Sequence, residues 1–235
     1  MRLDHFISKA LTLSERSARL EIAEGRVKVD GLVTKNHLQR VSKFSSVETK
    51  DRNLRTGIEP LYLMFHKPCG VLSATSDDHH QTVLDCLDWP GKETLYLAGR
   101  LDRSSSGLVL LTNDGDWSES LTDPDQKVSK HYLVTTDRDI PQDAVDRFTE
   151  GFDFQPEGIR TRPARLVIHE PRLASVTLEE GRYHQIKRMF HRIDGIRQTS
   201  LHRDRIGGNT LPSDLAAGKY RHLTEEEVRS HRVQS

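Results

Sequence analysis

The first sixty residues place apolar side chains in patterns that predict a small module of two helices and a hairpin. Within residues 3–11, apolar side chains stand at positions 3, 6, 7, 10 and 11, the spacing of a helix with one buried face. Residues 12–15 (Thr-Leu-Ser-Glu) match a capping box, so a second helix is predicted from there to Gly25. Val27 and Val29 alternate with polar residues and lead into Asp30-Gly31, which favours a type I′ hairpin.

From residue 61 onwards the pattern mixes strands and helices without a regular strand-helix alternation. Strands are predicted at 61–65, 96–98, 108–111, 132–136, 164–169 and 174–178, and helices at 116–121, 141–148, 183–193 and 224–235. This mixture predicts an α+β domain on a mostly antiparallel sheet. Apolar content falls between the two parts. We therefore expect a small domain over residues 1–50, a linker over 51–60 and a large domain over 61–235.

The segment 99–115, GRLDRSSSGLVLLTNDG, reads as a loop between two buried strands. Asp102 lies in this loop, and Gly99 and Gly107 allow it to bend tightly and to let another molecule approach its main chain. Two interpretations follow from the residues themselves. Asp102 is either a carboxylate placed for chemistry or a side chain that caps a turn.

Charge is balanced overall but segregated along the chain. The 235 residues include 35 Lys and Arg and 35 Asp and Glu, which by itself argues against a nucleic-acid partner. Residues 1–60 nevertheless carry 12 basic against 8 acidic side chains, residues 160–205 carry 11 against 5, and residues 77–125 carry 3 against 11. The two basic segments predict a positive surface for phosphates, the alternative being that opposite charges interleave on solvated faces.

Several classes of protein are disfavoured by composition. No apolar stretch approaches the roughly 20 residues of a membrane span, and Asp4 and His5 interrupt any apolar run of a signal peptide, so we expect a cytoplasmic protein without a membrane partner. Cys69 and Cys86 lack the spacing of a disulfide framework or zinc site. No metal site is expected at His79-His80, because no further ligand follows at a familiar spacing.

A set of motifs in fixed order resembles the RsuA/RluA superfamily of RNA pseudouridine synthases. The resemblance rests on segment 99–115, on Lys-Pro-Cys-Gly at 67–70, on Lys-His-Tyr-Leu-Val at 130–134, on residues 180–189 (EGRYHQIKRM), and on residues 201–208. Together these motifs span most of the large domain. The chain departs from the family pattern at His66, where Asn is common, and at Arg103-Ser104.

The resemblance implies an isomerase that breaks the N1–C1′ bond of a uridine, rotates the base and rejoins it through C5, with no metal or other cofactor. Asp102 matches the catalytic aspartate of the family, acting as nucleophile or as base. Lys187 matches the cation that pairs with this aspartate, and Tyr132 matches the tyrosine that stacks on the target base. Arg100 matches the arginine that occupies the space of a flipped base.

Candidate RNA-binding residues come from charge and position. Residues 1–50 resemble an S4 RNA-binding domain, and their outward basic residues form a phosphate footprint, with an ordinary solvated helix face as the alternative. The expected RNA contacts are Arg16, Arg19, Arg26 and Lys28 in this segment, and Arg182, Arg188 and Arg203 in the large domain.

The likeness across both segments implies a single uridine in 16S ribosomal RNA as the target, on the free RNA or on a small-subunit assembly intermediate, with the enzyme acting as a monomer. Alternatives are an enzyme for 23S ribosomal RNA and a non-catalytic RNA-binding protein. A metal nuclease using Asp102, Asp114 and Asp116 is disfavoured because two of these lie in a predicted turn. A glycosidase is disfavoured because no second carboxylate stands in a matching motif.

Overall fold

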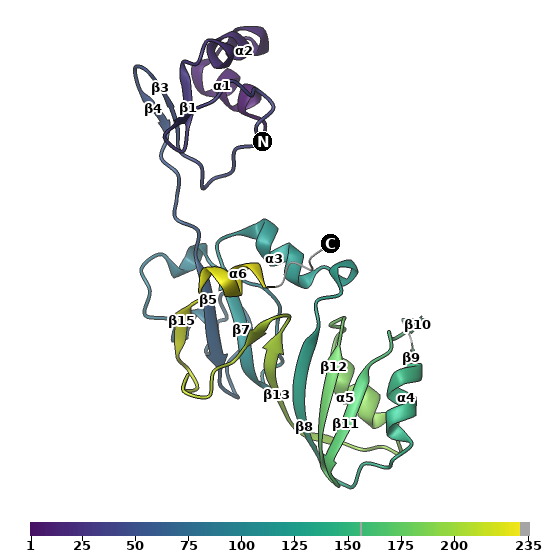
Figure 1. Ribbon diagram of the computed structural model, residues 1–235. Coiled ribbons are helices and arrows are strands. Elements are labelled where there is room, and N and C mark those ends of the chain that lie inside the picture. Colours follow the sequence, from purple (N-terminus) through teal and green to yellow (C-terminus); the bar gives the residue numbers. More distant parts are fainter. Residues whose placement is uncertain (156, 231–235) are drawn as a thin grey trace. The chain divides into compact units, whose positions relative to one another are not determined.

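The chain folds into two compact units, Met1–Pro60 and Leu61–Ser235 (Figure 1). The computed structural model describes residues 1–155 and 157–230. Both units combine helices with antiparallel strands, so the predicted α+β class is confirmed. In the described part of the chain, no helix has the length and apolar character needed to cross a membrane.

The first unit packs two helices against a four-stranded antiparallel sheet. Its elements are α1 (Leu3–Leu11), α2 (Glu15–Ala23), β1 (Val27–Val29), β2 (Leu32–Val33), β3 (Val47–Thr49) and β4 (Asn53–Arg55), and the strand order is β2-β1-β3-β4. Leu3, Ile7 and Ile22 from the helices meet Val27 and Val47 from the sheet in one small core. The helical spacing of apolar residues thus gives the buried face that it predicts.

Local chemistry at the turns of this unit differs in part from the sequence prediction. The side chain of Ser14, rather than Thr12, caps α2 by accepting the backbone N–H of Ser17, whereas Thr12 ends α1 at φ 55°. Asp30 and Gly31 have φ 52° and 77°, as a type I′ hairpin requires. The expected linker over 51–60 is corrected, because its residues 53–55 form β4 of the sheet.

The second unit is built on a nine-stranded sheet of order β11-β12-β8-β13-β7-β5-β15, with β6 on β7 and β14 on β13. The strands are β5 (Tyr62–Lys67), β6 (Tyr96–Leu97), β7 (Ser106–Thr112), β8 (Lys130–Thr136), β11 (Arg165–Glu170), β12 (Leu173–Leu178), β13 (Gln198–Ile206), β14 (Asn209–Thr210) and β15 (Tyr220–His222). All neighbours pair antiparallel except β13 and β7, which run parallel. The predicted hairpin of residues 164–178 is confirmed as β11 and β12.

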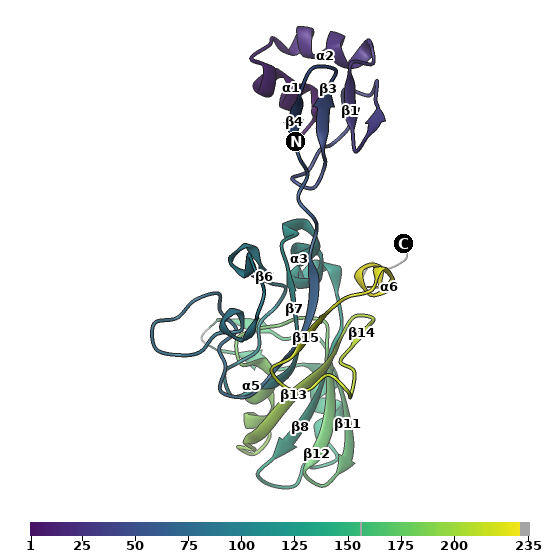
Figure 2. The same ribbon diagram turned by 90° about the vertical axis from the view of Figure 1, so that its left-hand side faces the viewer.

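Helices and short turns complete this unit (Figure 2). The helices are α3 (Gly115–Thr122), α4 (Ala144–Glu150), α5 (Gln185–His191) and α6 (Glu225–Arg229), with a two-stranded ribbon of β9 (Asp153–Phe154) and β10 (Ile159–Arg160) and single turns at Leu84–Cys86, Lys92–Thr94 and Pro124–Gln126. The predicted final helix over 224–235 is observed at α6. Its last five residues lie outside the described part of the chain.

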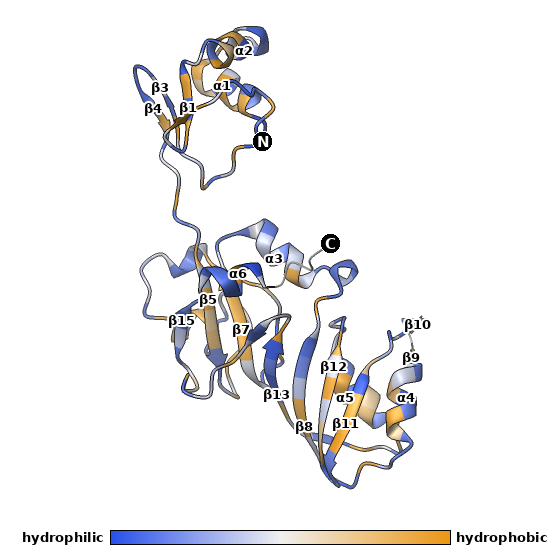
Figure 3. Cartoon of the chain, in the orientation of Figure 1, coloured by the Kyte–Doolittle hydropathy of each residue, from blue (hydrophilic) through white to orange (hydrophobic). Residues whose placement is uncertain are grey.

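The central strands are buried on both faces. Val109 and Leu111 of β7 join the core that includes Phe148 and Phe190 of α4 and α5, whereas Leu110 joins a second core with Trp117 of α3 on the opposite face. Figure 3 shows the resulting continuous apolar character of β5 and β7. A strand covered on both faces explains why the sequence runs Leu-Val-Leu-Leu instead of alternating.

Strand β13 is not predicted from the sequence, because its residues Gln-Thr-Ser-Leu-His-Arg-Asp-Arg-Ile are mostly polar (Figure 3). It nevertheless lies between β8 and β7 inside the sheet. Its parallel pairing brings Arg203 opposite Gly107. Strand β13 therefore packs the segment 99–115 against residues that come about 100 positions later in the chain.

Candidate active site

Asp102 lies in the loop that joins β6 to β7, and the backbone of this loop is held on both sides of the carboxylate. Leu101 is buried and its N–H donates to Ser73 Oγ at 3.0 Å. The N–H of Ser105 donates to the main-chain carbonyl of Asp102 at 3.0 Å. The side chain of Asp102 accepts no backbone N–H among the described residues and is 38% exposed. The turn-capping interpretation is therefore wrong, and the carboxylate faces a pocket.

Lys67, at the end of β5, binds the backbone of the same loop through its ammonium. Its side chain is buried, and Nζ donates to the carbonyls of Pro68 at 3.0 Å, Arg103 at 3.4 Å and Ser105 at 2.6 Å. Burial lowers the pKa of Lys67 to about 8. Sequence reasoning gives Lys67 no role, although a lysine that directly follows an apolar strand, in Lys-Pro-Cys-Gly, is the available signal.

Arg203 fastens the loop from β13. Its Nε donates to the carbonyl of Leu108 at 2.9 Å, and its Nη1 to the carbonyl of Arg100 at 3.3 Å. The residue is only 3% exposed. The prediction that Arg203 contacts an RNA phosphate is therefore wrong, because its guanidinium is buried in the fold. The guanidinium instead positions the backbone on either side of Asp102.

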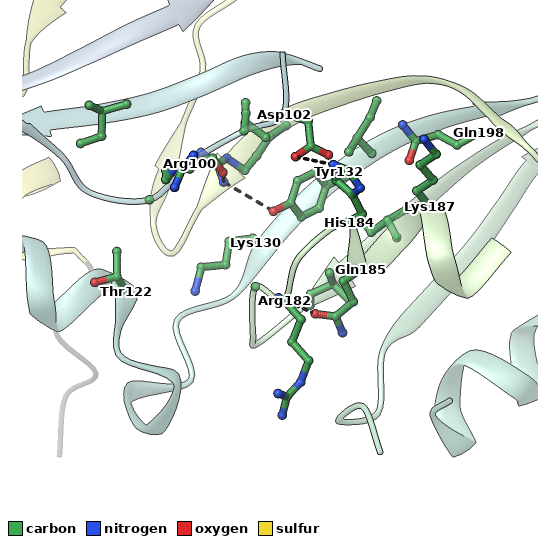
Figure 4. Close-up of a pocket in the computed structure, with 18 of the residues that line it drawn as sticks. Arg100, Asp102, Thr122, Lys130, Tyr132, Arg182, His184, Gln185, Lys187 and Gln198 are labelled. Carbon is green, nitrogen blue, oxygen red and sulfur yellow. Dashed lines mark hydrogen bonds and ion pairs between the residues drawn. The ribbon is translucent and has the colours of Figure 1, made fainter. Parts of the chain in front are cut away.

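Tyr132, on β8, forms part of the floor of the pocket. The tyrosine is 6% exposed, and its hydroxyl accepts a long hydrogen bond of 3.5 Å from Arg203 Nη1. A cavity of about 400 Å³ opens above the ring, and Asp102, Lys130 and Lys187 also line it (Figure 4). The cavity therefore combines an aromatic ring, a carboxylate and several cations in one place.

The basic side chain that contacts Asp102 is the imidazole of His184. Its Nε2 lies 3.4 Å from Asp102 Oδ1 (Figure 4), and the residue adopts φ 49° just before α5, with its ring stacked on Tyr183 at 3.8 Å. Lys187 lines the same cavity, but among the described residues its ammonium forms no ion pair with Asp102 within 4.0 Å. Lys187 is exposed, and a hydrated, flexible ammonium gains little from a surface ion pair. Sequence reasoning missed His184, which lies in the motif that contains Lys187.

Comparison with known proteins identifies the family. The RNA pseudouridylate synthase family model matches residues 61–192. The chain is 44% identical to ribosomal small subunit pseudouridine synthase A of Pseudomonas aeruginosa, over 97% of this chain and 99% of that protein. It is 43% identical to the protein of the same name from Escherichia coli K12, over 98% and 99%. The chain belongs to the RNA pseudouridylate synthase family.

A solved structure supports the same fold over both units. A crystal structure of a pseudouridylate synthase aligns with a TM-score of 0.71 and 35% identity, and covers 98% of this chain and 99% of its own. The predicted family and the predicted enzyme class, an isomerase that makes pseudouridine in RNA, are thereby confirmed. The matched segment of the pseudouridylate synthase model contains Asp102, Tyr132 and Lys187.

In this pseudouridylate synthase, the arginines expected to bind RNA around the pocket differ in exposure and in the partners that they already have. Arg100 is exposed and lines the cavity. Arg182 also lines it, and its Nε is held by the buried Glu180 at 2.9 Å. Arg188 is bound to Glu157 by two hydrogen bonds of 2.9 and 2.8 Å and stacks on a phenylalanine. Arg100 and Arg182 are therefore placed at the pocket, whereas Arg188 already has an internal partner.

The basic residues expected to bind RNA in the first unit divide in the same way. Arg19 donates to the buried carboxylate of Asp4 at 2.9 Å, and Arg26 is paired with Glu21 and Glu24. Arg16 and Lys28 are exposed and form no hydrogen bond or ion pair within the part of the chain that is described. The predicted footprint thus contains two free cations and two that stabilise the module itself.

Proposed function

We propose that this chain converts one uridine of small-subunit (16S) ribosomal RNA to pseudouridine. The observation that carries the proposal is the extent of the likeness to the small-subunit enzymes. The relatives match 97–98% of the chain, so the likeness extends over nearly all of residues 1–60 as well as the catalytic unit. In RNA recognition, appended domains and loops select the target, so similarity in both units favours a shared target.

The chemistry assigned to the pocket starts with the bond between C1′ of the ribose and N1 of the uracil. When this bond breaks, its electron pair stays on N1 and the base becomes an anion. Asp102 either attacks C1′ or removes a proton from the ribose, and both routes need an ionised carboxylate fixed beside the sugar. The base then turns and C5 bonds to C1′, which frees Asp102 from C1′ or returns its proton to the ribose. The C5 proton leaves to solvent and N1 gains a proton, so the product has the composition of the uridine although one hydrogen has been exchanged.

Other residues of the pocket hold the reacting nucleotide. Tyr132 offers its ring as a stacking surface for a base taken out of the RNA. Arg100, exposed at the rim, has the planar guanidinium that stacks on bases or binds phosphate. Lys187 moves towards Asp102 when RNA covers the pocket and excludes the water that keeps the two charges apart. These roles rest on the family motifs and on the shared cavity.

The proposed partner is ribosomal RNA, free or within a small-subunit assembly intermediate, and the proposed site of action is the cytoplasm. The enzyme acts on it as a monomer. The cleft that meets the RNA carries the exposed cations of residues 100, 182 and 187. Cations of this kind attract the phosphate backbone before any base is read.

Mapping pseudouridines in a deletion strain tests the target. Both ribosomal RNAs are treated with a reagent that modifies pseudouridine, and reverse-transcription stops are compared with those of the parent strain. Loss of one site in 16S RNA is the expected result. Loss of a site in 23S RNA would assign the enzyme to the large subunit, and no loss in either RNA would overturn the proposal.

Asp102→Asn tests the chemistry. The variant should bind RNA at least as well as the wild type, because a carboxylate gains nothing beside phosphates, and it should form no pseudouridine. Asp116→Asn, an exposed carboxylate on α3, is the matched control and should retain full activity. Substantial turnover by Asp102→Asn would remove the carboxylate from the mechanism.

A further inference from the structure

Lys130 is a lysine of the reaction pocket that the family comparison and the proposed roles leave unassigned. It is the first residue of β8, two positions before Tyr132, so the two side chains lie on the same face of the strand. Both line the cavity. Figure 4 shows Tyr132 between Lys130 on one side and Lys187 on the other.

The surroundings of Lys130 contrast with those of Lys67, the other lysine with a strongly lowered pKa. Lys67 Nζ is bound by three backbone carbonyls. Lys130 is half-buried, yet its ammonium has no hydrogen bond and no ion pair within the described residues. A buried charge without a partner is costly, and such groups concentrate at functional sites.

The electrostatics around Lys130 sharpen this contrast. Burial lowers the pKa of Lys130 to about 8, and the nearby guanidinium of Arg203 acts in the same direction. The titratable or charged groups that share the cavity with Lys130 are Arg100, Asp102, Tyr132, Arg182, His184, Lys187 and Arg203. Asp102 is the single carboxylate among these lining residues, and its Oδ1 lies 3.4 Å from Nε2 of His184. The ammonium of Lys130 is therefore available for a group that enters the cavity.

The position of Lys130 indicates that the group bound by its ammonium is the base of the RNA and not a phosphate. The exposed cations Arg100, Arg182 and Lys187 lie at the rim of the cavity, where they can contact the phosphates of a bound RNA. Lys130 is less exposed and shares its face with the stacking ring of Tyr132. A flipped nucleotide brings its base and sugar to this depth. Of these parts, only the uracil becomes negatively charged during the reaction.

We propose that Lys130 is a catalytic residue whose ammonium stabilises the negative charge on the uracil after its N1–C1′ bond breaks. The electron pair of the broken bond is delocalised onto the carbonyl oxygens of the ring, and the ammonium donates a hydrogen bond to one of them. The same contact holds the detached base while it turns to present C5. The inference rests on pseudouridine formation by this pocket and adds a residue to it. Stabilisation of this kind is worth about 10²–10³ in rate at other enzymes.

The test uses the full chain and 16S ribosomal RNA that carries tritium at C5 of its uridines, isolated from a strain that lacks the gene. Because C5 loses its hydrogen in the reaction, released tritium reports turnover. Lys130→Met should lower the single-turnover rate about 100-fold and leave RNA affinity within about twofold. Lys130→Arg should recover part of the rate. Lys127→Met, an exposed lysine three residues earlier, is the matched control and should behave as wild type.

A pH profile separates charge stabilisation from a packing role. In the wild type, the kcat/KM profile should fall above about pH 8, as the free enzyme loses the proton of Lys130. In Lys130→Arg this fall should move to higher pH, because a guanidinium stays protonated. An identical alkaline limb in the two proteins would overturn the proposal.

Folding does not confound the result, because removing an unpartnered ammonium from a half-buried position should leave the melting temperature of Lys130→Met unchanged or raised. An unchanged rate in Lys130→Met overturns the inference while the proposed function stands. A loss of affinity together with a salt slope reduced by about 0.7 would instead make Lys130 a phosphate contact and also overturn it. Absence of tritium release by the wild type would overturn the proposed function itself.

Discussion

Gly107 and Arg203 lie directly opposite each other where β7 and β13 run parallel. A Cβ atom at position 107 would lie 2.2 Å from the carbonyl oxygen of Arg203 and 2.6 Å from its nitrogen. Gly107 also has φ 113°, a conformation that side-chained residues rarely adopt. The sequence predicts that another molecule approaches the main chain of this loop, but at Gly107 the space is taken by β13 of the same chain, which carries the arginine that holds the Asp102 loop.

Gly107→Ala should destabilise the catalytic unit and inactivate it. The added methyl group meets the backbone of Arg203, and overpacking together with the unfavourable φ should cost about 2–5 kcal/mol in the free energy of unfolding. Denaturant unfolding and tritium release measure the two effects. Gly115→Ala is the control, since a Cβ there meets nothing within 4 Å and alanine favours its helix. A fully active, fully stable Gly107→Ala would show that β13 can move away at no cost.

Lys67→Met should lower both stability and activity, because the carbonyls of Pro68, Arg103 and Ser105 lose their donor. Leaving buried acceptors unsatisfied costs about 1–3 kcal/mol. The pKa of Lys67 is lowered to about 8 in the fold, so above pH 8 the unfolded chain binds more protons than the folded one. The stability of the wild type relative to Lys67→Met should therefore increase between about pH 8 and 10.5 and be independent of pH below that window.

Urea unfolding of both proteins at pH 7, 8, 9 and 10 measures this difference, in which the titration of every other group cancels. A difference that stays flat to pH 10 would mean that the buried ammonium is not desolvated in the fold. Lys92→Met provides a comparison, because among the described residues that lysine donates to a single carbonyl, that of Leu87. Its loss should therefore destabilise the fold less than the loss of Lys67 does at pH 7.

Lys187 and His184 are the two basic side chains that could support the Asp102 carboxylate, and variants separate their roles. Lys187→Met should lower turnover about 100-fold if its ammonium reaches the carboxylate in the RNA complex, and Lys187→Arg should restore part of it. His184→Asn removes the imidazole but tolerates the left-handed backbone at φ 49°, so a loss there reports the ring rather than strain. We expect His184→Asn to lose less than Lys187→Met. The reverse order would make His184 the working cation.

The exposed cations of the first unit should determine the salt dependence of RNA binding. Replacing Arg16 and Lys28 together by alanine should reduce the slope of log affinity against log salt by about 1.4 to 1.8, with turnover at saturating RNA preserved. Arg26→Ala is the contrast, because Arg26 is occupied by Glu21 and Glu24 and should leave the slope unchanged. Equal slopes in all three proteins would assign another role to this module.

Elements with a strong local signal were predictable from the sequence. The hairpin at Asp30-Gly31 follows from two residues that accept positive φ, and the doubly buried strand β7 from its unbroken apolar run. The position of Asp102 between two strands follows in the same way. These features depend on neighbours a few residues apart, which a sequence pattern records.

Features made by distant partners were not predictable in this way. Strand β13 is polar because Arg203 binds the Asp102 loop and other side chains of the strand are exposed, so no periodic apolar pattern marks it. Arg203 was expected at the surface because of its charge, but carbonyls of residues 100 and 108 draw it into the interior. The contact of His184 with Asp102 likewise joins residues 82 positions apart in the numbering. Such contacts depend on the tertiary fold.

The hydrogen bonds of Arg203 to the Asp102 loop have a consequence for the newly synthesised protein. The arginine is synthesised about 100 residues after the aspartate that it helps to place. At about 5–20 residues per second, the loop waits roughly 5–20 s on the translating ribosome before its last support emerges. Nascent chains stalled before residue 203 already contain Asp102, Tyr132 and Lys187, yet we expect them to release no tritium from RNA. The enzyme would then be silent towards ribosomal RNA until translation of its catalytic unit is nearly complete.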